Sequence, residues 1–175
     1  NLMFFKSYIS HLIVILFMVI SISSFSQEYS KKNIIDIANS IINDSHSCVF
    51  ITLDSNNKPT SRLMDPNIYN NDFEIYLVTN PNSRKVSHIR NDNRITLNFS
   101  HNDGGSYVSI NGTAKLINEL DQKKKYWKSD WTPYYKDLNR DCILIKINPK
   151  SLEIVSTSNN ILSNPLTWEP TTIIF

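Results

Sequence analysis

Most of the chain after residue 46 consists of short segments in which apolar residues alternate with polar ones or form brief runs. A two-residue period is typical of β-strands. Turn-forming residues separate these segments, as at Asp54–Lys58 and Asn102–Gly105. The six expected strands are Ser47–Leu53, Pro59–Met64, Phe73–Thr79, Arg94–Ser100, Tyr107–Ile117 and Asp141–Val155. This pattern predicts a mainly β protein built as a small antiparallel barrel.

Helical periodicity is confined to a few segments. From Tyr29 to Asn43, apolar residues recur every three or four positions, which is the stripe of an amphipathic helix. A second helix is expected over Ser83–Asn91, with Ser83 as its N-cap. Others are expected over Asp121–Lys128 and near Pro133–Leu138. We therefore expect a few helices beside a dominant sheet.

The first segment has the pattern of a secretory signal. Lys6 precedes an apolar stretch, Ile9–Ile22, and small polar residues follow up to Ser26. An uncleaved anchor is the alternative, but the stretch is shorter than the roughly 20 residues of a spanning helix. We expect cleavage between Ser26 and Gln27, export to a bacterial periplasm, and no stable membrane insertion afterwards. The chain then divides into a signal peptide (1–26), a barrel domain (27–156) and a C-terminal tail (157–175).

Composition excludes several classes of function. The three glycines, Gly104, Gly105 and Gly112, are too few for a dinucleotide-binding or P-loop glycine motif. A net charge of +2, without a long basic run, gives no reason to expect nucleic acid as a partner. No clustered histidine or CxxC pair indicates a metal site. Cys48 and Cys142 lie in expected strands; buried thiols are the simpler account, and a disulfide stays open.

One group of residues predicts a site that binds an anion. An expected strand ends at Thr79, and Ser83, Arg84 and Lys85 then open an expected helix. Free amides at a helix N-terminus attract phosphate, and cationic side chains add charge-assisted hydrogen bonds. Solvated basic residues at a helix start are the alternative. Arg62, on the expected strand Pro59–Met64, is a second arginine that would converge on the same anion.

The order of these elements resembles the flavin-binding split-barrel superfamily of the pyridoxamine 5′-phosphate oxidases, most of all its general stress protein 26 branch. The resemblance runs from about Ile35 to Val155 and rests on Arg62–Met64, Ser83–Lys85, Asn93–Phe99 and Val108–Ala114 in this order. It implies a six-stranded antiparallel split β-barrel. It also implies a homodimer with FMN in a groove at the subunit interface.

The resemblance also assigns roles to single residues. Arg62, Ser83, Arg84 and Lys85 match residues that hold the FMN phosphate. The backbone of Leu63 and Met64 matches the strand under the flavin ring, and Val78 and Thr79 match residues at the ring edge. No catalytic side chain is expected, because the flavin carries the chemistry. Haem or a deazaflavin is the alternative cofactor.

Three functions remain open from the sequence, and the simplest of them is a fold with a degenerate groove that serves association alone. The first is an FMN-dependent oxidoreductase acting on a small substrate. The oxidases proper recognise their pyridoxal substrate partly through a C-terminal arginine and histidine, and Leu166–Phe175 contains neither. Vitamin B6 oxidation is therefore not the expected activity. The alternative is a non-catalytic barrel that binds a flavin, haem or deazaflavin in a stress response.

Three other groups of residues have simpler explanations. The aromatic residues Tyr126, Trp127, Trp131, Tyr134 and Tyr135 are expected to pack over the barrel mouth, or to line the flavin face. Lys123–Lys125 is interpreted as a solvated helix face. The histidines at positions 46, 88 and 101 are scattered along the chain, and none is expected to be catalytic.

Overall fold

The computed structural model describes residues 29–70 and 72–175. The expected signal peptide and its cleavage site therefore lie outside the described residues. The chain divides into two units, Asn1–Ser30 and Lys31–Phe175, and the fold below is that of the second. No helix among the described residues has the length and apolar character needed to span a membrane.

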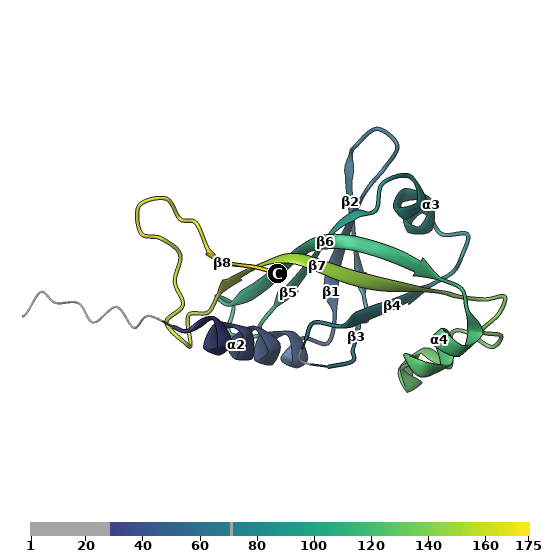
Figure 1. Cartoon of the computed structure of the whole chain (residues 1–175), viewed down its shortest axis with the longest axis horizontal. Coiled ribbons are helices and arrows are strands. Elements are labelled where there is room, and N and C mark those ends of the chain that lie inside the picture. The colour runs from purple at the N-terminus through teal and green to yellow at the C-terminus, as the bar shows by residue number, and fades with distance from the viewer. Residues whose placement is uncertain (1–28, 71) are drawn as a thin grey trace, which may run out of the picture. The chain divides into compact units, whose positions relative to one another are not determined.

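A single antiparallel sheet forms the body of this unit (Figure 1). The six expected strands are confirmed, with ends that move by two residues or fewer, and two more join them. The bounds are β1 Cys48–Leu53, β2 Pro59–Met64, β3 Asn67–Ile68, β4 Ile75–Thr79, β5 Arg94–Ser100, β6 Tyr107–Ile117, β7 Ile143–Val155 and β8 Thr171–Ile174. The expected count of six was wrong because β3 is too short to show a period and β8 lies in the tail.

The strand order is β2-β1-β5-β6-β7-β4-β3, and β8 pairs with the far half of β7. β2 and β3 are thus the two ends of a curled sheet, as in a split barrel. The sheet bends where β6 and β7 change register after Asn111. A side chain at Gly112 would come within 2.3 Å of the Asn148 carbonyl oxygen, so this bend requires glycine.

The helices are α2 (Lys31–Asp44), α3 (Arg84–Asn91) and α4 (Leu120–Lys125), with a 3₁₀ turn, η1, over Ser129–Trp131. α2 buries the predicted apolar stripe against β5 and β6. Three of the four expected helices are confirmed, although α4 is shorter than expected. The helix expected near Pro133–Leu138 is wrong: turns occupy that stretch.

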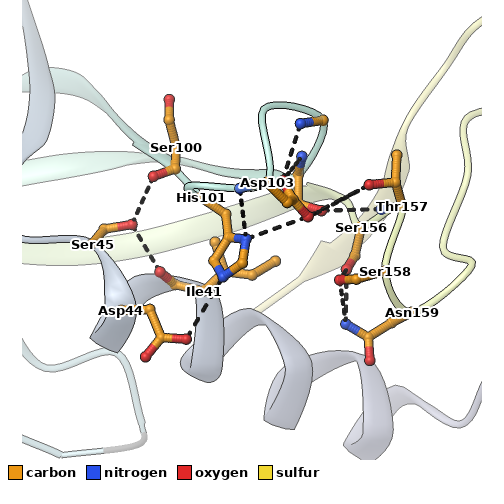
Figure 2. Close-up of polar contacts among 12 residues, drawn as sticks. Ile41, Asp44, Ser45, Ser100, His101, Asp103, Ser156, Thr157, Ser158 and Asn159 are labelled. Atoms are coloured by element: carbon orange, nitrogen blue, oxygen red, sulfur yellow. Dashed lines mark hydrogen bonds and ion pairs between the residues drawn. The ribbon is translucent and has the colours of Figure 1, made fainter.

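A polar cluster joins the end of α2 to the β5–β6 turn (Figure 2). The Ser45 hydroxyl donates to the carbonyl of Ser100, and His101 lies between the carboxylates of Asp44 and Asp103. The Ser106 hydroxyl donates to Asp103 and, with backbone N–H groups, holds the pKa of that carboxyl well below its usual value. The cluster fixes the turn that connects β5 to β6.

Both cysteines are free and buried, as the simpler account from the sequence expects. Cys48 lies on the core side of β1, and burial raises its thiol pKa to about 12. Cys142 immediately precedes β7 and is fully buried. Neither thiol therefore has the exposed, thiolate-favouring surroundings of a reactive cysteine.

Lys123 contradicts the expectation of a solvated lysine face. Lys124 and Lys125 are exposed, but the side chain of Lys123 is 0% exposed. Its ammonium donates to Asn118 Oδ1 (2.9 Å), the Leu138 carbonyl (2.6 Å) and the Cys142 carbonyl (2.8 Å). Three oxygen acceptors satisfy all three N–H donors, which is how a buried ammonium becomes tolerable. The lysine thereby ties α4 to the loop that precedes β7.

Replacing Lys123 with methionine should lower the free energy of unfolding by about 2–4 kcal/mol, because three buried acceptors lose their donor. Urea denaturation measures this change. The control is Lys124→Met, an exposed neighbour, which should stay within about 0.5 kcal/mol of the native chain. Equal stability of the two variants would contradict the assigned role.

Candidate functional site

The predicted anion site lies where the end of the curled sheet meets α3. β2 is the terminal strand, and the chain leaves β4 at Thr79 to begin α3 five residues later. The β1–β2 register pairs Arg62 with Phe50, a fully buried residue. Because paired residues share a sheet face, Arg62 lies on the core side of β2 rather than on the outside.

Contacts on this core side hold Arg62 in place. Its Nη1 donates to the Phe50 carbonyl (3.0 Å) and to Thr52 Oγ1 (2.9 Å). Its guanidinium carbon lies 5.6 Å from the centre of the Phe50 ring. Burial, and secondarily the nearby charge of Arg84, lowers the pKa of Arg62. The charge is thus partly shielded from bulk water and lies near a like charge.

Thr79, at the end of β4, positions Lys85. Its ammonium donates to Thr79 Oγ1 (2.9 Å), and that oxygen lies 3.2 Å from Ser83 Oγ. Ser83 occupies the predicted N-cap position, but its hydroxyl makes no capping bond to the helix. Burial first, and then Arg62 and Arg84, lowers the pKa of Lys85.

These cations surround one pocket of about 230 Å³, lined by Ser61, Arg62, Ser83, Arg84 and Lys85. The structure therefore brings together all four residues predicted to hold a phosphate. None of the three cations forms an ion pair with any residue of 29–70 or 72–175. Uncompensated like charges around a hollow are unfavourable alone and become favourable when an anion enters.

The residues predicted to face a flavin ring do not line this pocket. Leu63 is 72% exposed and lies on the outer face of β2. Met64 is half-buried, at the end of the same strand. Val78 and Thr79 are buried on β4, whose edge away from β7 pairs with β3 only at Ile75 and Tyr76. The backbone of β4 beyond Tyr76 is thus left without a neighbouring strand on that edge, within the described residues.

Sequence reasoning missed Thr52 and His88. The Thr52 hydroxyl, 1% exposed, accepts the hydrogen bond from Arg62 and lies 2.9 Å from His88 Nδ1. It therefore connects β2 to α3. The signal was a threonine at an inward position of β1, next to Phe50, because a buried hydroxyl requires partners. No local pattern marks His88, whose partner lies 36 positions earlier.

The aromatic segment after β6 packs as a structural element. Tyr126 and Trp131 belong to a buried cluster with Val78 and residues of β4 and β7. Asp65, directly after β2, accepts hydrogen bonds from Trp131 Nε1 (3.0 Å) and from Lys128. These bonds fix the segment against the end of β2. Packing thus accounts for Tyr126 and Trp131, whereas Tyr134 is 80% exposed.

The cation cluster predicts that removing one of its charges raises the free energy of unfolding. Arg84 begins α3, where a positive charge opposes the helix dipole, and two other cations are close. Arg84→Gln should therefore raise the free energy of unfolding by about 0.3–1 kcal/mol at about 0.01 M salt, and less at about 1 M. Arg90→Gln, in the last turn, should not stabilise the chain. A loss of stability in Arg84→Gln at both salt concentrations would contradict this account.

Comparisons with known proteins identify the family of the chain. The family model described as "Pyridoxamine 5′-phosphate oxidase like" matches residues 34–168. General stress protein 26 of Bacillus subtilis (strain 168) is 23% identical over 136 residues, which cover 75% of this chain and 91% of that protein.

Solved structures show the same fold at low identity. A protein from Clostridium acetobutylicum, described as related to general stress protein 26 and of the pyridoxinephosphate oxidase family, has a TM-score of 0.69 at 16% identity, covering 83% of this chain and 96% of that one. A heme binding protein from Mycobacterium smegmatis has a TM-score of 0.63 at 12% identity, covering 80% and 57%. Because the family model spans most of the chain, the protein belongs to the pyridoxamine 5′-phosphate oxidase-like family.

Proposed function

We propose that the chain binds FMN and acts as an oxidoreductase on a small substrate. The observation that carries this proposal is the pocket in which Arg62, Arg84 and Lys85 converge without a carboxylate partner among the described residues. A phosphate dianion would compensate these charges. Ser83, in the same pocket, adds a hydroxyl that can donate to a phosphate oxygen.

Two features of the site support FMN as the ligand, one for each end of the molecule. The pocket of about 230 Å³ suits a phosphate and is below the roughly 300–1,000 Å³ of sites that enclose a whole ligand. The remainder of the molecule would lie along the end of β2, at Leu63 and Met64, facing the unpaired edge of β4 at Val78 and Thr79. A bound flavin supplies hydride or electron transfer. The chain's residues bind the phosphate, orient the ring and limit access of water.

We further propose that a second copy completes the site. The outer face of the sheet carries a groove of about 440 Å³, lined in part by Ile51, Leu53, Thr96 and Asn111. Leu63 lies on this same face, because its register partner Val49 is two residues from Ile51 on β1. A homodimer with the cofactor at its interface would cover both the groove and the exposed Leu63.

Non-catalytic binding of a flavin, haem or deazaflavin is the second candidate. It is favoured by the likeness in fold to the heme binding protein of Mycobacterium smegmatis. The two candidates differ in turnover. Steady consumption of NAD(P)H by the FMN-loaded protein supports the oxidoreductase, whereas binding without consumption of any reductant supports the second candidate.

The phosphate pocket predicts that loss of its cations weakens the binding of FMN but not that of riboflavin. The double variant Arg84→Ala, Lys85→Ala should bind FMN at least about tenfold more weakly, since each charge-assisted hydrogen bond contributes about 1.5–3 kcal/mol. It should bind riboflavin, which lacks the phosphate, as the native chain does. Quenching of flavin fluorescence during titration measures both affinities.

The matched control is the double variant Arg90→Ala, Lys124→Ala. Like the pocket variant, it removes one arginine and one lysine, but from exposed positions that do not line the pocket. It should keep the native affinity for FMN. Absence of saturable FMN binding by the native chain would overturn the proposal. Equal losses for FMN and riboflavin in the pocket variant would refute the phosphate role of the two residues.

A further inference from the structure

Arg62 divides its hydrogen-bond donors between the protein and the phosphate pocket. Its Nη1 atom donates to two acceptors on β1, the Phe50 carbonyl and Thr52 Oγ1. Its Nε and Nη2 atoms form no hydrogen bond with any residue of 29–70 or 72–175. These two nitrogens are therefore the donors that remain for an anion in the pocket that Arg62 lines. The bonds of Nη1 decide where they point.

The Thr52 hydroxyl accepts from Arg62 and has one hydrogen of its own to place. The residue is 1% exposed, so bulk water does not reach that hydrogen. Among the described residues, Oγ1 has two hydrogen-bond partners, Arg62 Nη1 and His88 Nδ1, each at 2.9 Å. The Thr60 hydroxyl contacts Thr52 at its carbonyl oxygen (3.4 Å) rather than at Oγ1. Because Arg62 accepts no hydrogen bond, the Thr52 hydrogen goes to His88 Nδ1.

This arrangement assigns the tautomer of the His88 ring. If Nδ1 carried the proton, Thr52 Oγ1 would accept from both Arg62 and His88, and its own hydrogen would lack an acceptor. A buried donor without a partner is costly. With the proton on Nε2 instead, Nδ1 accepts from Thr52 and every buried group is satisfied. The hydroxyl then turns its lone pairs toward Arg62.

We propose that His88 is a positioning residue that fixes Arg62 for the phosphate through Thr52. The inference rests on the proposed function, which places a phosphate among Arg62, Arg84 and Lys85. The charges of Arg84 and Lys85 repel the guanidinium of Arg62. An acceptor whose lone pairs face Arg62 counters this repulsion, and His88 Nδ1 keeps the hydroxyl turned that way. The imidazole does not itself line the phosphate pocket, so its effect on the ligand passes through Thr52.

Affinities for FMN and riboflavin measure this role. His88→Phe removes the acceptor and should weaken FMN about three- to tenfold, the effect of one hydrogen bond. It should leave riboflavin within about twofold, because riboflavin has no phosphate. His88→Asn should restore FMN to within about twofold of the native affinity, since its amide oxygen can accept from Thr52. Ser87→Ala, an exposed neighbour on α3, is the control and should change neither affinity.

The tautomer of His88 provides a test that needs no flavin. Proton–nitrogen correlation spectra of the imidazoles at alkaline pH, where the rings are neutral, should show the His88 proton on Nε2. The signal that disappears in His88→Asn identifies the ring.

The outcomes separate this inference from the proposed function. A proton on Nδ1, an unchanged FMN affinity in His88→Phe, or equal losses for FMN and riboflavin each overturn the role of His88 and leave the proposed function intact. Failure of the native chain to bind FMN overturns the proposed function and, with it, the role of His88 at the phosphate.

Discussion

The mutual repulsion of three cations at the end of the sheet is the constraint on which the site depends. Arg62 is held on the core side of β2 by Phe50 and Thr52, and Lys85 is held by Thr79. Both therefore stay near Arg84 although their charges repel. A fold keeps such an arrangement at a cost in stability, and occupation by an anion removes that cost.

The two ends of the sheet do not pair with each other, and this makes the arrangement of the three cations possible. β2 has a neighbour on one side only, and β4 leaves its edge uncovered beyond Tyr76. Closure by strand pairing would fill the space with backbone hydrogen bonds. Because the ends of the sheet stay apart, side chains from β2 and α3 line a hollow instead. The segment held by Asp65 and Trp131 packs against the end of β2 and fixes one side of that opening.

Much of the fold followed from the alternation of apolar residues, since a buried sheet face imposes a two-residue period. β3 was missed because two residues show no period, and Lys123 because its partners lie across a loop. The cations of the site were found because a strand, a turn and a helix start place them predictably. Thr52 and His88 were missed because their pairing exists only once β1 and α3 pack together.

The protonation state of bound FMN shows whether the three cations hold its phosphate. A free phosphomonoester takes up its second proton near pH 6. Among Arg62, Arg84 and Lys85 the dianion should be favoured, so the phosphorus resonance of the bound ligand should not titrate between about pH 5 and 7. A bound phosphate that titrates as it does in free FMN would show that the three cations do not hold it.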